Sequence, residues 1–264
     1  MTLLFLIHAF ILGVIEGLTE FLPISSTGHL IIGAYLLDAN YSNIHVFEIF
    51  IQLGAILAIV YEYRNLLSQK VISIKQRSSK HFFINLFLAF LPAAFMGLLF
   101  HDSIKRYLFN PISVSLALIL GGLLILVIEN SLKKRRYKSI EQISFSTALR
   151  IGLFQCFALI PGVSRSGATI MGGMLLNLDR KSATEFSFFL AIPIIFAASF
   201  YDLFKNFDSL SSDDALFFLI GFVTSFYSAL IVIRFLIRFV ATNDFKIFAY
   251  YRIFIGILFL ILFY

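Results

Sequence analysis

Two glutamates near the start of the chain are the first side chains whose type and spacing suggest chemistry. Glu16 and Glu20 are four residues apart, so they lie on one face of a helix, inside an apolar stretch from about residue 3 to 37. Ionisable groups within such stretches are costly to bury and usually serve a function. Paired carboxylates suit a divalent cation, Mg²⁺ or Ca²⁺, or a proton acceptor. The alternative is that both lie at a helix end in water or pair with a structural cation.

A cluster of hydroxyl groups and an imidazole follows Pro23. It consists of Ser25, Ser26, Thr27 and His29. Proline interrupts a helix, so we expect these residues at the start of a second helix, where free N–H groups and the helix dipole favour an anion. Ser26 and His29 lie three residues apart on one face, and beside the glutamates they are the groups that acyl or phosphoryl transfer needs. The alternative for the hydroxyl groups is N-capping alone.

A second break, at Pro161 and Gly162, precedes Ser164, Arg165 and Ser166. A guanidinium in the middle of an apolar stretch needs an anionic partner, and its fork of donors suits phosphate or carboxylate. The alternative is a structural ion pair with Glu16 or Glu20. Two facing helix starts and an arginine would form an anion-binding cavity. The glutamates would repel that anion unless they are protonated or bridged by a metal ion.

The composition determines which elements must position these groups. The 264 residues are 59% hydrophobic and 14% charged, with a mean hydropathy of +0.92, whereas soluble domains have roughly 45–50% apolar and about 25% charged residues. This excludes a water-soluble globular protein and predicts an all-α, polytopic integral membrane protein with one domain over 1–264. We attribute the net charge of +6 to cytoplasmic loops and not to nucleic-acid binding.

The two breaks also indicate an internal duplication. At one constant offset Gly13 matches Gly152, Ser25 matches Ser164 and Gly28 matches Gly167. We expect two repeats, about 1–130 and about 147–264, each with one re-entrant helix hairpin and three transmembrane helices. An odd number of crossings inverts the second repeat, so the breaks meet near the midplane. Irregular backbone at that depth must be buried in protein or line a wet cavity.

The loops indicate the orientation, because lysine and arginine concentrate in cytoplasmic loops. Residues 62–81 and 130–150 are rich in these cations, whereas 101–111 holds few and 202–214 is mainly acidic. This places the first two loops in the cytoplasm, and the last two together with both chain ends outside. The cations of the first two loops are Arg64, Lys70, Lys75, Arg77, Lys80, Lys133, Lys134, Arg135, Arg136, Lys138 and Arg150.

Both break segments resemble the two signature motifs of the undecaprenyl-diphosphatase family, the bacitracin-resistance type. The motifs read EGLTEFLPISSTGHL over 16–30 and PGVSRSGAT over 161–169. The likeness extends along the whole chain, including FEIFIQLGA over 47–55 and EFSFFLAIP over 185–193. The resemblance implies a multi-pass enzyme of the bacterial inner membrane with a site open to the periplasm. It also implies the reaction: the enzyme removes the terminal phosphate of undecaprenyl diphosphate and so regenerates the lipid carrier for cell-wall synthesis.

The resemblance also implies roles for individual residues. Glu16 and Glu20 match the acidic pair of the family, Ser26 and His29 its nucleophile and acid–base candidates, and Arg165 its phosphate-binding arginine. We expect Ser25, Thr27, Ser164 and Ser166 to bind the substrate. Whether Ser26 or His29 attacks, whether the glutamates hold Mg²⁺ or Ca²⁺, and whether the protein is a homodimer are left open by the sequence.

Two other classes of protein, a transporter and a structural subunit, could have the same apolar segments as a phosphatase. A transporter or flippase for the phosphorylated isoprenyl carrier would use the same inverted repeats and anion cavity. A purely structural subunit explains none of the buried polar groups. The combination of Ser26, His29 and Glu20 favours an enzyme, because a binding site needs neither a nucleophile nor a base.

Overall fold

The computed structural model describes residues 3–39, 41, 44–108, 110–131, 139–206 and 215–263, and within these ranges all regular structure is helical. The α-helices of the first half are α1 Leu3–Thr19, α2 Ser26–Leu36, α3 Ile44–Glu62, α4 Arg64–Ile72, α5 Arg77–Leu108 and α6 Pro111–Ser131. Those of the second half are α7 Phe145–Cys156, α8 Arg165–Leu175, α9 Arg180–Lys205, α10 Ala215–Thr242 and α11 Lys246–Phe263, with short 3₁₀ turns at Ile140–Gln142 and Phe157–Leu159. The predicted all-α class is confirmed.

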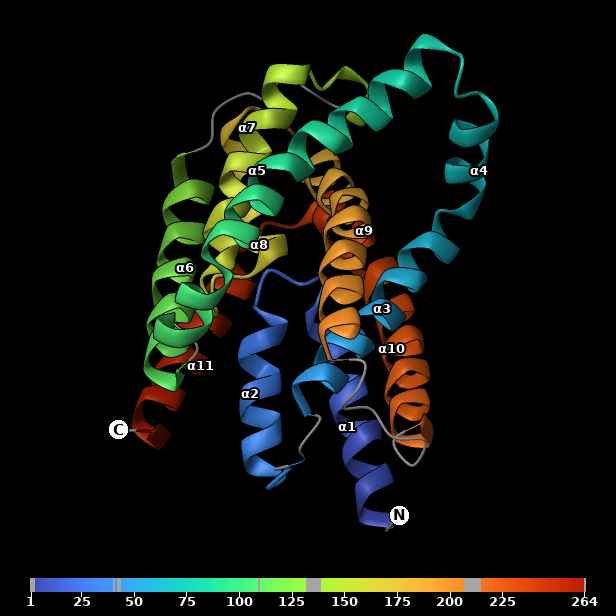
Figure 1. The fold of residues 1–264 in the computed structure, drawn as a ribbon. Coiled ribbons are helices and arrows are strands. Elements are labelled where there is room, and N and C mark those ends of the chain that lie inside the picture. The colour runs from blue at the N-terminus through green and yellow to red at the C-terminus, as the bar shows by residue number, and fades with distance from the viewer. Residues whose placement is uncertain are drawn as a thin grey trace.

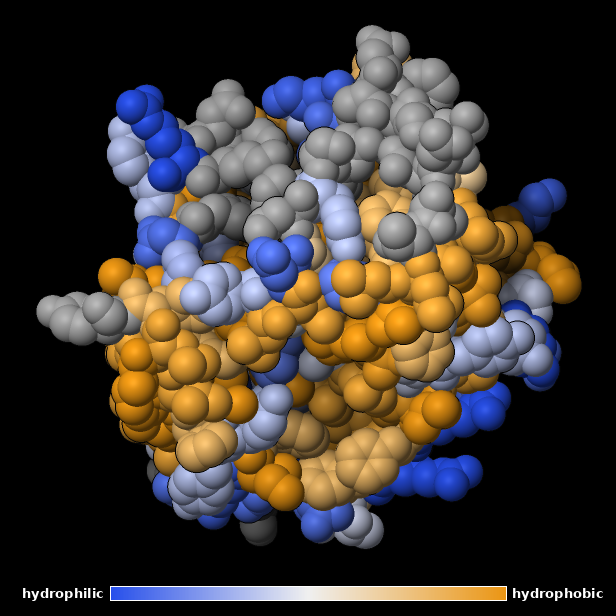
Figure 2. All heavy atoms as spheres, turned by 90° about the horizontal axis from the view of Figure 1, so that it is seen from below, coloured by the Kyte–Doolittle hydropathy of each residue, from blue (hydrophilic) through white to orange (hydrophobic). Residues whose placement is uncertain are grey.

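Five of these helices are long and apolar enough to cross a membrane, or six if α3 and α4, which meet at a bend of 72°, count as one span. Large apolar side chains are exposed on their outer faces, among them Phe204 at 88% and Ile261 at 72%. Figure 2 shows hydrophobic side chains over much of the face seen from the end that carries the chain termini. Such continuous apolar surface needs lipid around it, so the chain is a multi-pass membrane protein.

Both proline-containing segments are broken where the sequence predicts. α1 ends at Thr19 and α2 begins at Ser26, while the second segment is irregular from Ile160 to Ser164 and continues as α8. α2 and α8 have 11 residues each, about 17 Å at 1.5 Å per residue, which is too short for a hydrocarbon core of about 30 Å. Figure 1 shows α1 and α2 in the lower half of the molecule and α7 and α8 in the upper half.

The two breaks have the same local geometry. Ser25 and Ser164 are the N-caps of α2 and α8, and their hydroxyl oxygens accept the backbone N–H groups of Gly28 and Gly167. Both serines have positive φ angles, 73° and 74°, a left-handed conformation that costs energy for residues other than glycine. The N-capping expected as the alternative for the first cluster is thus seen at Ser25, and Ser164 caps α8 in the same way. The backbone strain lies directly beside both helix starts.

Close helix packing holds the broken segments in place. α1 packs against α10 and α7 packs against α5. A Cβ atom at Gly13 would lie 2.4 Å from the carbonyl oxygen of Gly221 on α10, and one at Gly152 would lie 2.4 Å from that of Ala89 on α5. Only glycine permits such approaches, which is why these two residues recur at matching places in the two segments.

Several of the charged loop residues that indicate the orientation lie outside the described residues. This holds for Lys133, Lys134, Arg135, Arg136 and Lys138 in one loop, and for Asp208, Asp213 and Asp214 in another. Within the described part of the chain, α4 and the start of α5 lie at the end of the molecule opposite to the start of α1 and the end of α11 (Figure 1).

Candidate active site

A cavity of about 220 Å³ lies where the two breaks meet. Its polar side is formed by residues of both breaks and by two glutamines, and its apolar side by α5, α9 and the turn before the second break. The polar lining comprises Glu20, Ser25, Ser26, Thr27, Gln52, Gln155, Ser164 and Arg165. The apolar lining includes Ala93, Ala158, Leu159, Ile194, Ile195 and Ala198.

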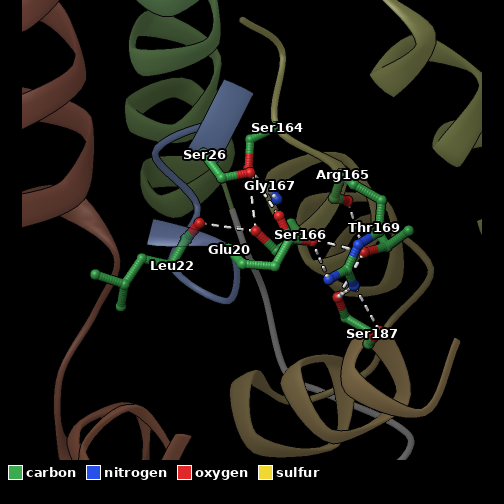
Figure 3. A network of polar contacts seen from close by, with 9 residues as sticks. All are labelled: Glu20, Leu22, Ser26, Ser164, Arg165, Ser166, Gly167, Thr169 and Ser187. Atoms are coloured by element: carbon green, nitrogen blue, oxygen red, sulfur yellow. Dashed lines mark hydrogen bonds and ion pairs between the residues drawn. The ribbon is translucent and has the colours of Figure 1, made fainter. Parts of the chain in front are cut away.

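Glu20 joins the two breaks. Its Oε2 accepts the hydroxyl proton of Ser26 at 2.5 Å, and its Oε1 accepts an Arg165 Nη2 proton at 3.1 Å. Figure 3 shows the carboxylate between these two partners. The structural alternative of an ion pair with Glu20 is therefore present, and the same carboxylate is placed to take a proton from Ser26.

Arg165 also forms hydrogen bonds to α9, and one of its nitrogens has no hydrogen-bond partner among the described residues. Its Nη1 donates to the backbone oxygen of Ser187 at 2.8 Å and to the Ser187 hydroxyl at 3.3 Å. Thr169 donates to the same hydroxyl at 2.7 Å. The Arg165 Nε is buried and has no hydrogen-bond partner among the described residues. Because a guanidinium carries five donors, the contacts to Glu20 and Ser187 leave part of its donor capacity unused, and Arg165 lines the cavity.

Ser166 is the one predicted substrate-binding residue that does not line the cavity. It is fully buried, and its hydroxyl donates to the backbone oxygen of Leu22 at 2.8 Å and lies 3.0 Å from the Ser164 hydroxyl. This contact joins the two breaks directly (Figure 3). Ser166 thus links the two breaks beside the cavity, whereas Ser25, Thr27 and Ser164 line the cavity itself.

His29 makes no contact with Ser26 in the hydrogen bonds of the described residues, although it follows Ser26 by only three positions. Its Nδ1 is 2.8 Å from the backbone oxygen of Ser25 and its Nε2 is 2.7 Å from the hydroxyl of Tyr251 on α11, whose ring stacks on the imidazole. His29 is not among the cavity-lining residues. The expected pair of hydroxyl and imidazole is not formed, because the ring bonds back to its own helix start and the Ser26 hydroxyl bonds to Glu20.

Glu16 lies behind the cavity. It is 0% exposed, neither carboxylate oxygen has a hydrogen-bond partner among the described residues, and its electrostatic neighbours are Glu20, Glu48 and Arg165. The described residues contain no group of three or more His, Cys, Asp or Glu side chains arranged to hold a metal ion. An orphaned carboxylate beside a second carboxylate is nevertheless a donor set that suits a hard cation such as Mg²⁺ or Ca²⁺.

The sequence interpretation missed four residues of this region, one of which, Gln52, lines the cavity as Gln155 does. Ser187 and Thr169 position Arg165, and Gln155 lines the cavity with both of its amide atoms unpartnered among the described residues. A signal for Gln155 was present, because the offset that matches Ser25 with Ser164 also places Gln155 opposite Glu16. Ser187 matches Glu48 in the same way.

Comparison with known proteins extends over nearly the whole chain. The family model described as bacitracin resistance protein BacA matches residues 9–258. A protein of Nitrosospira multiformis named undecaprenyl-diphosphatase is 57% identical over 97% of this chain and 94% of its own length. A protein of Methylobacillus flagellatus with the same name is 54% identical over 98% of this chain and 98% of its own length. One of Pseudomonas syringae pv. syringae is 50% identical over 96% of this chain and 92% of its own length. The chain therefore belongs to the bacitracin resistance protein BacA family.

Proposed function

We propose that this protein is an integral membrane phosphatase that hydrolyses undecaprenyl diphosphate to undecaprenyl phosphate and inorganic phosphate, and so recycles the lipid carrier of cell-wall synthesis. The observation that carries the proposal is the chain of contacts from Ser26 through Glu20 to Arg165, between two helix starts that face one cavity. Its relatives' names point to the same reaction. Phosphate release by the purified protein tests it.

We assign the attack to Ser26. Its oxygen forms a bond to the terminal phosphorus while its proton passes to Glu20, and the bond from that phosphorus to the bridging oxygen breaks. Undecaprenyl phosphate leaves with the electron pair of that bond and takes up the proton. A water molecule then attacks the phosphorus of the phosphoserine and gives a proton to Glu20. The bond between that phosphorus and the Ser26 oxygen breaks, the Ser26 oxygen takes the proton from Glu20, and inorganic phosphate leaves.

Charge stabilisation falls to Arg165 and the two helix starts. Phosphoryl transfer depends mainly on positioning and on groups that neutralise the equatorial oxygens. Arg165, which lines the cavity, and the backbone N–H groups in the first turns of α2 and α8 that the caps do not bind are the groups we assign to this. Fixed donors in a dry cavity need no reorganisation during the reaction.

Glu16 and Glu20 are the residues that would hold a divalent cation, Mg²⁺ or Ca²⁺. Such a cation supplies positive charge against the transferred phosphoryl group and removes the repulsion between that group and the carboxylates. The burial of Glu16 without a partner supports this assignment.

The apolar side of the cavity suits a lipid substrate. Ile194, Ile195 and Ala198 on α9 lie in the half of that helix away from Arg180, and Ala198 is also exposed on the outer surface. An exposed residue in the cavity lining supports an opening of the cavity toward the membrane at α9. We propose that the isoprenyl tail enters there from the membrane while the diphosphate reaches the polar side.

Substitution at this opening should separate tail binding from chemistry. For Ala198→Phe we expect a KM for undecaprenyl diphosphate about tenfold higher, because overpacking costs about 1–3 kcal/mol and 1.4 kcal/mol corresponds to a factor of ten. Cleavage of a short-chain isoprenyl diphosphate should change by less than about twofold. Ala197→Phe is the control, because Ala197 is also an exposed alanine of α9 but does not line the cavity. Equal effects of Ala198→Phe on both substrates would rule out this entry route.

We also propose that the chain forms two inverted repeats, about 1–130 and about 147–264, with both break segments re-entrant and the cavity open to the outer face of the bacterial inner membrane. Three observations support this: the matching N-caps, the reciprocal packing of α1 on α10 and α7 on α5, and the left-handed residues Asp38 and Asn177 that follow α2 and α8. In an inverted pair each contact should recur with the roles of the repeats exchanged.

Cysteine labelling tests this topology. In a Cys156→Ser background, Tyr107→Cys should react with a membrane-impermeant maleimide in intact spheroplasts, and Lys75→Cys should react only after permeabilisation. The reason is that Lys75 belongs to the cation-rich 62–81 loop and Tyr107 to the 101–111 stretch. Both side chains are exposed, so reaction of both from one side would contradict the inverted arrangement.

A further inference from the structure

A second arginine is buried at the meeting point of the two breaks. Arg252 on α11 is 1% exposed, and it heads the largest fully buried side chains of the described residues. None of the ion pairs in the described part of the chain includes it. A buried charge without a carboxylate partner is costly, so the contacts that replace the partner identify its role.

Every terminal nitrogen of Arg252 donates to a backbone carbonyl. Nη1 donates to Pro23 at 2.9 Å and to Val163 at 3.0 Å, which places one nitrogen between the first break and the second. Nη2 donates to Gly162 at 2.9 Å and to Ala117 on α6 at 3.1 Å, while Nε reaches the neighbouring carbonyl of α6 at 3.3 Å. The guanidinium therefore binds both breaks and one helix at once.

Three of these carbonyls, those of Pro23, Gly162 and Val163, belong to the irregular backbone of the two breaks, outside any helix. Pro23 lies two residues before the N-cap Ser25, and Val163 lies directly before the N-cap Ser164. In a membrane interior, unpaired backbone groups are strongly unfavourable. A planar fork with five donors can satisfy several carbonyls in fixed directions, whereas a lysine ammonium offers three donors on a flexible stem.

The surrounding structure leaves room for this side chain. A Cβ atom at Gly121 on α6 would lie 2.1 Å from Arg252 Nη2 and 2.7 Å from its Cζ. One at Gly167, in the first turn of α8, would lie 3.3 Å from Nη1. Gly121 thus provides the space that the guanidinium occupies.

We propose that Arg252 is a positioning residue that fixes the two breaks relative to each other, and thereby aligns Ser26 and Arg165 for phosphoryl transfer. It acts through the backbone, because it is absent from the cavity lining and its nitrogens are already bonded. The inference rests on the proposed phosphatase function for its kinetic consequence, but its structural consequence can be measured without activity.

The experiment compares Arg252→Lys and Gly121→Ala with Gly97→Ala in the detergent-solubilised full chain. Gly121→Ala keeps the arginine but displaces its guanidinium, while a Cβ at Gly97 meets only an ordinary contact of 3.5 Å. Hydrogen exchange should accelerate at the amides of both helix starts, 26–28 and 165–167, in the first two variants and at neither in the control. The kcat for undecaprenyl diphosphate should fall about 100-fold with KM changed less than about threefold, as expected for misplaced reacting groups.

A double variant tests whether the two residues act together. Gly121→Ala added to Arg252→Met should lower kcat less than about twofold further, because the guanidinium it displaces is already gone. If Arg252→Lys and Gly121→Ala both exchange faster than the wild type at the two breaks but the wild-type protein releases no phosphate, the positioning role is upheld and the proposed function is rejected. Unchanged exchange at the breaks, a rise in KM alone, or loss of thermal stability with normal kcat in the folded fraction would overturn the positioning role.

Discussion

Arg165→Lys is expected to abolish nearly all phosphate release while the protein remains folded. An ammonium cannot keep the contacts to Glu20 and Ser187 and also present a further directed donor to phosphate. Breaking a charge-assisted bond in a dry site costs about 2–5 kcal/mol, which corresponds to a loss of about 30-fold to several thousandfold in kcat/KM. The measurement is steady-state phosphate release in detergent, with thermal unfolding as the check on folding.

Arg238→Lys is the matched control, because it makes the same chemical change at an exposed position. It should leave kcat/KM within about twofold of the wild type, as surface substitutions usually do. Near-normal phosphate release by Arg165→Lys would exclude Arg165 as the residue that stabilises the phosphate, and the ion pair with Glu20 would then be structural only.

Ser26→Ala should have the second large effect, because it removes the proposed nucleophile and the hydrogen bond to Glu20 together. We expect kcat to fall by about 10³-fold or more, as for other nucleophile deletions. Glu20→Gln should cause a similar loss, and the double variant should be no worse than either single one, since residues that act as a unit are not additive.

His29→Gln separates the two candidate nucleophiles that the sequence left open. His29 contacts the Ser25 carbonyl and Tyr251 outside the cavity. Loss of one such hydrogen bond costs about 0.5–1.5 kcal/mol, so kcat should fall by no more than about tenfold. If His29→Gln is as inactive as Ser26→Ala, and a covalent phosphoryl group is found on histidine, the assignment of the attack to Ser26 is wrong.

The broken helices and their caps were predictable because they depend on local chemistry. Pro23 and Pro161 each stand beside a cluster of small hydroxylated residues, and a serine that follows such a break can cap the next helix. Proline alone is not the signal, because Pro92 and Pro193 lie inside the continuous helices α5 and α9. The sequence also indicated that Arg165 needs an anionic partner, a phosphate group or a glutamate, and the ion pair with Glu20 is the second of these. The low content of charged residues predicted a membrane protein, and apolar stretches near 20 residues long predicted that it is helical.

Contacts between distant segments were not predictable in the same way. The helical spacing of Ser26 and His29 suggested that they meet, but ring orientation depends on Tyr251, which is 222 residues away. Arg252 lies in the first half of the apolar helix α11, and by sequence alone it is one of the cations assigned to the inner boundary. Its role depends on the carbonyls of both breaks, whose meeting is a property of the tertiary structure.

Phosphate release from undecaprenyl diphosphate by the purified wild-type protein tests the central claim most directly. Detergent solution has no second compartment, so a transporter or flippase would produce no signal there. We predict multiple turnovers to undecaprenyl phosphate and inorganic phosphate, assayed with and without added Mg²⁺ or Ca²⁺, and no turnover by Ser26→Ala from the same preparation. A folded wild-type protein that binds the lipid but releases no phosphate under any of these conditions would contradict the phosphatase and favour a carrier.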